Sequence, residues 1–138
     1  MDEIHVIGGK CLHGNITVQG SKNTVLPLMA GALLYRGINV LKACPRITDV
    51  FYMEEILRAL GAETWWEDHD LYLDCTHADG SHVPEIYSGR MRSSIILLGP
   101  ILARNQQAEI GYPGGCVIGK RPVDLHLYVL RRFGAEIK

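Results

Sequence analysis

The stretch 113–119, Pro-Gly-Gly-Cys-Val-Ile-Gly, places a cysteine between three glycines. Such a loop can move and can bring its backbone close to a ligand. Lys120 and Arg121 follow directly, and neighbouring cations favour the thiolate form of a cysteine. Cys116 is therefore a candidate nucleophile or proton donor, and a buried thiol that packs as a small hydrophobe is the alternative. We expect the other three cysteines to be structural: Cys11, Cys44 and Cys75.

Cations also stand at the expected starts of helices. Gly20-Ser21-Lys22-Asn23 precedes a run of helical periodicity. A helix N-terminus carries unpaired N–H groups and a partial positive charge, and Lys22 adds a full charge. This segment predicts a site for phosphate or carboxylate, with a plain turn and a solvated lysine as the alternative.

Two further segments also place arginines at the expected start of a helix. Residues 121–126, Arg-Pro-Val-Asp-Leu-His, open a helix with proline at the first position and an acid in the first turn. Arg121 and the helix N–H groups there could hold the phosphates of a nucleotide. Arg90 and Arg92 flank the start of another helix at Met91-Arg92-Ser93-Ser94, where cations oppose the helix dipole. An anionic ligand would explain them, and ordinary surface arginines are the alternative.

Other chemistries have little support. Cys75, His77 and His82 lack a fourth ligand and the spacing of a zinc site, so we expect neither metal nor cofactor. The sequence contains no GxxxxGK[ST], GxSxG or HExxH motif. The 138 residues carry a net charge of -1, which argues against nucleic-acid binding. With no signal peptide and no apolar run of membrane length, we expect a cytoplasmic protein without membrane contact.

The elements that would position these residues alternate between strand and helix. We expect strands at 4–7 and 15–19 joined by a glycine turn, and a helix from Ser21 to about Leu34 with Pro27 in its first turn. A strand at 38–41 and a helix at 51–60, capped by Thr48 or Asp49, should follow. Next we expect a hairpin at 64–66 and 71–73, a loop at 75–88, a helix at about 89–104, a strand at 108–111 and a helix at 122–133.

The chain also repeats itself. Leu34, Pro45 and the segment 57–63 correspond to Leu102, Pro113 and the segment 130–136. The repeat of about 70 residues is a whole α/β unit, and its second copy carries five extra residues in the glycine-rich loop around Cys116. Function is expected where such a loop departs from the repeat.

Four motifs in order resemble one family. They are Gly20-Ser21-Lys22-Asn23 with Leu26-Pro27, the segment 91–95, the segment 98–104, and the string 113–126, PGGCVIGKRPVDLH. Together they resemble the N-terminal third of the enolpyruvyl transferases that act on UDP-N-acetylglucosamine, in the enolpyruvate transferase family. The resemblance implies transfer of enolpyruvyl from phosphoenolpyruvate to the sugar 3′-hydroxyl with phosphate release, the first committed step of peptidoglycan synthesis.

The resemblance also assigns roles by position. Lys22, Asn23 and Arg121 would bind phosphoenolpyruvate, Arg92 would contact the UDP-sugar, and the segment Arg121, Pro122, Val123, Asp124 and Leu125 would hold its uridine-diphosphate end. Cys116 would be the catalytic proton donor, the site of a phosphoenolpyruvate adduct and the target of fosfomycin.

The fold implied is an inside-out α/β barrel built from βαβαββ repeats, of which this chain holds about two incomplete copies. Residues 1–20 would be a strand pair of the second domain, and residues 21–138 part of the first. A general-base aspartate and a further arginine would come from segments beyond these residues, so we expect the chain alone to be inactive and to need the rest of the enzyme. The alternative is a non-catalytic UDP-sugar-binding module or a degenerate paralogue.

Overall fold

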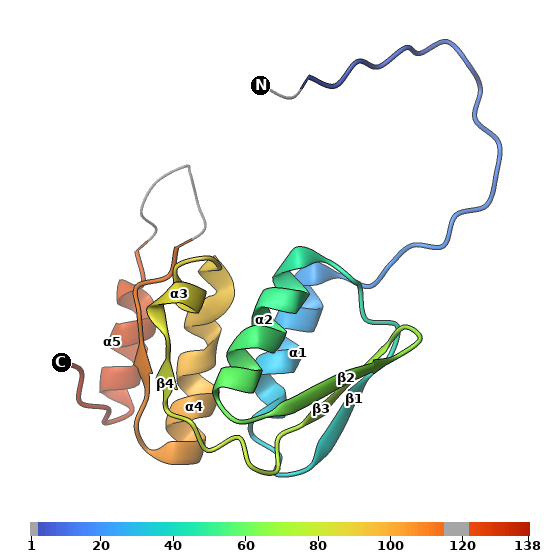
Figure 1. Cartoon of the computed structure of the whole chain (residues 1–138). Helices are drawn as coiled ribbons and strands as arrows, with labels where there is room; N and C mark the ends of the chain where they lie inside the picture. Colours follow the sequence, from blue (N-terminus) through green and yellow to red (C-terminus); the bar gives the residue numbers. More distant parts are fainter. Residues whose placement is uncertain (1–2, 115–121) are drawn as a thin grey trace.

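The computed structural model describes residues 3–114 and 122–138. Its first half is a three-stranded sheet covered on one face by two helices (Figure 1). In order along the chain these elements are α1 (Lys22–Ala32), β1 (Ile38–Leu41), α2 (Thr48–Ala59), β2 (Glu63–Glu67) and β3 (Asp70–Asp74). The strand order is β1-β3-β2, and β3 is antiparallel to both neighbours. The hairpin and both helices expected here are confirmed.

The second half consists of shorter elements: β4 (His82–Val83), α3 (Glu85–Ser88), the 3-10 helix η1 (Arg92–Leu97), α4 (Leu98–Asn105), β5 (Glu109–Ile110) and α5 (Asp124–Arg132). β4 and β5 pair in parallel. The expected loop at 75–88 was wrong in part, because it contains β4 and α3.

Prolines account for two further differences. The single helix expected at 89–104 is divided into η1 and α4 because Pro100 cannot donate to the carbonyl of Ile96, and its ring crowds that carbonyl. Pro27 lies in the second turn of α1 rather than the first, so the carbonyl of Asn23 receives no helical hydrogen bond from it.

Residues 3–20 form neither helix nor strand and extend away from the body (Figure 1). The strands expected at 4–7 and 15–19 are therefore wrong for this structure. A two-stranded hairpin alone is marginal in water, and here it has no sheet to join. Ile7 is 97% exposed as a result. Cys11 is exposed on the same segment, so its expected structural role was also wrong, whereas Cys44 and Cys75 are buried as expected.

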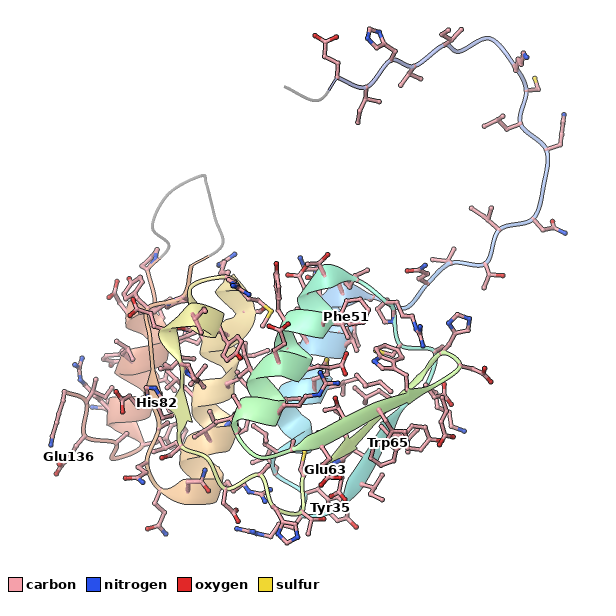
Figure 2. The ribbon with its side chains drawn as sticks, viewed as in Figure 1. Tyr35, Phe51, Glu63, Trp65, His82 and Glu136 are labelled. Atoms are coloured by element: carbon pink, nitrogen blue, oxygen red, sulfur yellow. The ribbon has the colours of Figure 1, made fainter. Side chains whose placement is uncertain are left out.

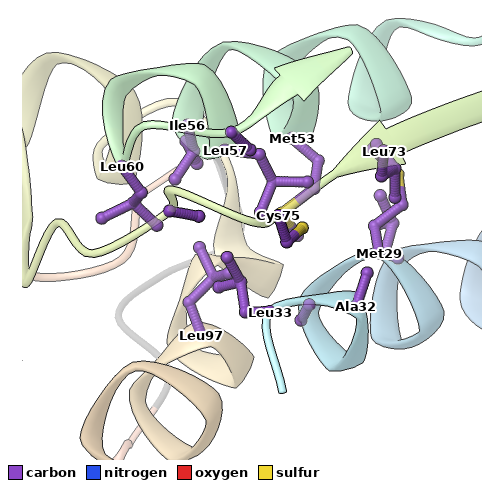
Figure 3. Packing of buried hydrophobic residues seen from close by; sticks show 14 of the residues in the cluster. Met29, Ala32, Leu33, Met53, Ile56, Leu57, Leu60, Leu73, Cys75 and Leu97 are labelled. Atoms are coloured by element: carbon purple, nitrogen blue, oxygen red, sulfur yellow. The ribbon is translucent and has the colours of Figure 1, made fainter. Parts of the chain in front are cut away.

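The core lies where α1 and α2 meet the sheet on one side and η1 and α4 on the other (Figure 3). Leu33 at the C-cap of α1, Leu57 of α2, Leu73 of β3 and Leu97 of η1 are each at most 1% exposed. Apolar residues of α2 recur at helical spacing, which buries one face of that helix against both layers. The other buried apolar members of this core include Leu26, Met29, Met53, Ile56, Leu60, Leu71, Cys75, Met91 and Ile101.

Arg104 links the second half of the chain to the first through hydrogen bonds. The Arg104 side chain on α4 is 4% exposed and donates to the carbonyls of Leu33 at 2.7 Å and Cys75 at 2.6 Å. Its Nε also donates to Asp79 at 3.2 Å. Carbonyls at the end of α1 and after β3 are thereby satisfied by a side chain from the second half.

The internal repeat is visible in the helix ends. Gly61 after α2 and Gly134 after α5 have φ of 98° and 92°, a conformation that favours glycine. Gly61 N–H donates to Arg58 and Ala62 N–H to Leu57, and the pairs Gly134–Arg131 and Ala135–Leu130 repeat this arrangement 73 residues later. The sequence correspondence between 57–63 and 130–136 therefore reflects the same helix termination.

Candidate functional site

Lys22 is the first residue of α1, and its charge is already paired. Its Nζ lies 2.7 Å from Oδ2 of Asp49 in the first turn of α2, with the lysine side chain 50% exposed and the aspartate side chain 31% exposed. Asn23 beside it is exposed. The sequence offers Asp49 as a possible helix cap, but the N-cap is Ile47, and Asp49 instead pairs with Lys22 at the beginning of α1. An acid in the first turn of α2 was the available signal, but only packing places it beside Lys22.

Arg92 begins η1 and is exposed. The preceding Met91 is 2% exposed and anchors this turn in the core. Arg90 is also exposed, and its guanidinium lies 5.9 Å from the centre of the Tyr52 ring on α2. Buried apolar and aromatic contacts therefore fix the backbone that presents two arginines.

The glycine-rich loop is anchored at its first end. Gly114 N–H donates to the carbonyl of Ser88 at 3.1 Å, and the buried Ser94 hydroxyl donates to the same carbonyl at 3.3 Å. A Cβ at Gly114 would overlap the carbonyl of Gly89, so only glycine fits there. This close approach explains one of the glycines in the motif. Cys116 and Arg121 lie outside the described residues.

The segment after the loop leads into α5. Val123 is 9% exposed and is the N-cap, Asp124 is the first helical residue, and Leu125 is 79% exposed. Pro122 is exposed and precedes the N-cap, so it stands two residues before the first helical position in which sequence analysis placed it. The acid expected in the first turn is present.

These positions share one end of the molecule. α1, α2 and α5 all begin there, and α3, which leads to Arg90 and Arg92, lies at the same end (Figure 1). Gly114 and Pro122 therefore flank residues 115–121 close to the beginnings of several helices. Arg90 and Arg92 are exposed cations at this end, and Lys22 is a third cation whose charge is paired with Asp49. The first turns of α2, α3 and α5 carry the acids Asp49, Glu85 and Asp124.

A groove beside this end of the molecule includes Leu125, the second residue of α5. The open groove has a volume of about 400 Å³ and lies between η1 and α4 on one side and α5 on the other. Its lining is apolar except for His126 and consists of Ile95, Ile96, Leu98, Gly99, Leu125, His126, Val129 and Leu130. Within residues 3–114 and 122–138, no three His, Cys, Asp or Glu side chains gather to hold a metal ion. No helix in the described part of the chain is long and apolar enough to cross a membrane.

The described residues form a mixed α/β structure in which several helices begin at one end, where Arg90 and Arg92 are exposed (Figure 1). The family model of EPSP synthase (3-phosphoshikimate 1-carboxyvinyltransferase) matches residues 6–138. The chain therefore belongs to this family of enolpyruvyl transferases, and its fold is part of the α/β fold of that family.

Individual proteins that are similar to this chain are also named as enolpyruvyl transferases. UDP-N-acetylglucosamine 1-carboxyvinyltransferase 2 of Caldanaerobacter subterraneus subsp. tengcongensis is 42% identical over 138 residues, covering 100% of this chain and 33% of that protein. UDP-N-acetylglucosamine 1-carboxyvinyltransferase of Dichelobacter nodosus is 38% identical over 138 residues, covering 99% of this chain and 33% of that protein. The crystal structure of the enolpyruvyl transferase NikO from Streptomyces tendae matches with a TM-score of 0.65 and 27% identity over 71% of this chain and 23% of that chain. The chain spans about a third of the length of the curated relatives it matches.

Proposed function

We propose that this chain supplies the N-terminal part of a cytoplasmic enolpyruvyl transferase. That enzyme moves the enolpyruvyl group of phosphoenolpyruvate to the 3′-hydroxyl of UDP-N-acetylglucosamine and releases phosphate, the first committed step of peptidoglycan synthesis. The observation that carries the proposal is the 42% identity to a UDP-N-acetylglucosamine 1-carboxyvinyltransferase along the whole chain. The cations at one end of the structure support it, because both substrates are anions.

In this proposal the reaction is an addition followed by an elimination. The Cys116 thiol gives a proton to the methylene carbon of phosphoenolpyruvate while the sugar hydroxyl adds to the neighbouring carbon, and the hydroxyl proton passes to the general-base aspartate supplied by the rest of the enzyme. The resulting tetrahedral ketal then loses phosphate, and its methyl group returns a proton to the Cys116 thiolate, which restores both the double bond in the product and the thiol. Lys22, Asn23 and Arg121 bind phosphoenolpyruvate, while Arg92 and residues 121–125 bind the UDP-sugar.

In this scheme Lys22 must leave Asp49 in order to bind phosphoenolpyruvate. An incoming phosphate competes with Asp49 for the ammonium, and a partly exposed ion pair of this kind contributes only about 0–1 kcal/mol. Asp49→Asn should therefore strengthen phosphoenolpyruvate binding by up to about fivefold, whereas Lys22→Met should weaken it. Calorimetric titration of the reconstituted enzyme measures both, with Glu55→Gln on the same helix as the control. Weaker binding by Asp49→Asn would contradict the competition.

We propose further that the chain is inactive alone. α2 and α5 are repeat counterparts, yet α2 buries Ile56 and Leu60 almost completely. The matching residues of α5, Val129 and Phe133, are 47% and 85% exposed. An apolar helix face of this kind needs a covering layer, and the relatives have about two further thirds of chain that could supply it.

Complementation in trans tests the proposal. The 138-residue chain is mixed with a separately produced remainder of a relative, and phosphate release is followed with both substrates present. We expect turnover in the mixture, none in either part, and none with Cys116→Ser. Tight UDP-sugar binding by the isolated chain, with no turnover after complementation, would instead indicate a non-catalytic binding module.

A further inference from the structure

The face of the three-stranded sheet that points away from α1 and α2 carries an exposed aromatic row. Val40, Tyr72 and Trp65 stand opposite one another across β1, β3 and β2. The Trp65 and Tyr72 rings are stacked, with centroids 5.1 Å apart and 14° between their planes. Val40 is 41% and Trp65 36% exposed, and Ile38 on the same face is 53% exposed. None of the described helices covers this face (Figure 1).

Carboxylates border the aromatic row on both sides. Glu63 and Asp74 are register partners on one side, and Glu67 and Asp70 are partners on the other. Because residues two apart on a strand share a face, all four belong to the face of Trp65 and Tyr72. Lys42 directly follows β1 and carries an opposing charge, against the four carboxylates of the face.

The carboxylates also hold the rings. Trp65 Nε1 donates to Glu67 at 3.4 Å. A hydrogen bond to Glu67 raises the pKa of Tyr72, which keeps its hydroxyl protonated as a donor. Hydrogen bonds from Thr76 lower the pKa of Asp74, so that carboxylate stays ionised.

On the opposite face of β2, an arginine already lies over a tryptophan ring. Trp66 packs inward, and the guanidinium of Arg46 lies 4.8 Å from its ring centre. In the described part of the chain, no guanidinium occupies the corresponding place over the Trp65–Tyr72 pair. Arginine stacks on aromatic rings and pairs with carboxylates at the same time, so the outer face has the chemistry to receive one.

We propose that this outer sheet face, defined by Val40, Trp65, Tyr72 and the four bordering carboxylates, binds an arginine-bearing segment of a partner protein. A guanidinium stacks on the Trp65–Tyr72 pair, and neighbouring basic side chains pair with the carboxylates on either side. The face lies on the sheet, away from the end at which α1 begins with Lys22 (Figure 1), so binding here is separate from the proposed transferase reaction.

The two tryptophans of the chain give an internal control, because they lie on opposite faces of one strand. The experiment titrates the ¹⁵N-labelled 138-residue chain with a nine-residue peptide of alternating arginine and glycine, and follows both indole N–H signals. A peptide with citrulline in place of arginine has the same shape without charge. We expect the arginine peptide to shift the Trp65 signal and leave that of Trp66 in place, and binding to weaken with added salt.

A matched pair of variants tests the charges. Glu63→Gln with Glu67→Gln removes two carboxylates from the face, and Glu3→Gln with Glu136→Gln removes two elsewhere; Figure 2 shows Glu136 on the opposite side of the molecule from Glu63 and Trp65. The first pair should weaken binding about fivefold to tenfold and the second less than twofold.

Some outcomes would overturn the proposal. Equal binding of the citrulline peptide, equal affinity of the two double variants, or a shift of Trp66 alone would each show that the face does not select arginine. Self-association of the chain that blocks the Trp65 shift would assign the face to a second copy instead. These readouts need no catalytic turnover, so they stand apart from the test of the transferase.

Discussion

Glu54 on α2 is a charged residue that should behave as part of the core. It is 1% exposed, and its carboxylate accepts hydrogen bonds from Arg58 at 2.8 Å, Thr64 at 2.8 Å and Trp66 Nε1 at 3.0 Å. The bonds from Thr64 and Trp66 join α2 to β2. In Glu54→Gln one oxygen is replaced by an NH₂ group, so one of these donors must face another donor.

The cost of this substitution can be worked from those contacts. A buried donor left without an acceptor costs about 1–3 kcal/mol, and bonds to a neutral amide are weaker than bonds to a carboxylate. We therefore expect Glu54→Gln to lower the free energy of unfolding by about 2–3 kcal/mol. With a urea dependence of about 1.5 kcal/mol per molar, the midpoint falls by about 1–2 M.

Urea unfolding followed by far-ultraviolet circular dichroism measures the effect, with near-ultraviolet dichroism reporting on Trp66. Glu55→Gln is the matched control, because it removes the same charge at the next, partly exposed position. That control should change the free energy of unfolding by less than about 0.5 kcal/mol. If the two variants are equally stable, the carboxylate does not hold α2 to β2 as described.

Further predictions concern stability, pH and thiol reactivity. Arg104→Lys cannot reach several separate carbonyls from one nitrogen, so urea unfolding should show a loss of about 2–4 kcal/mol, and wild-type stability would refute the role of the guanidinium. Hydrogen bonds from Arg36 and Arg104 lower the pKa of Asp79 below its ordinary 3.8, so its stabilisation is present at neutral pH and is lost as acid protonates it. Stability of Asp79→Asn should therefore fall less steeply below about pH 4, and an unchanged acid slope would count against this. Burial, followed by the charge of Glu54, raises the pKa of Cys44 to about 11. Iodoacetamide at pH 8 should label exposed Cys11 at least about a hundredfold faster than Cys44 in peptide mass spectrometry, and equal rates would contradict the burial.

Local pattern was enough to predict much of this fold. The apolar spacing of α2 and the glycines that follow α2 and α5 depend on neighbours within a few residues, and the structure confirms them. The hairpin of β2 and β3 is local in the same way. The segment 15–19 also has a strand pattern, but a strand needs a partner that local sequence does not provide, and here the segment stays extended and exposed.

The candidate site likewise has some features that local sequence predicts and others that depend on the packing of distant segments. The helix starts near Lys22, Arg92 and Asp124 could be predicted because the change to helical apolar spacing is local, although none of these three helices has a side-chain hydrogen bond at its N-cap. The pairing of Lys22 with Asp49 could not, since it depends on α1 and α2 beginning at the same end of the molecule. Burial of an acid such as Glu54 likewise follows from distant donors that only the folded structure brings together.

The most direct test of the central proposal is identification of the product. The chain, complemented with the remaining segments of a relative, is incubated with phosphoenolpyruvate and UDP-N-acetylglucosamine, and the nucleotide sugar is analysed by mass spectrometry. We predict a UDP-sugar that carries an enolpyruvyl ether on the 3′-oxygen, formed with an equal amount of phosphate and absent with Cys116→Ser. Phosphate release without that ether, or an ether formed equally well by Cys116→Ser, would contradict the proposal.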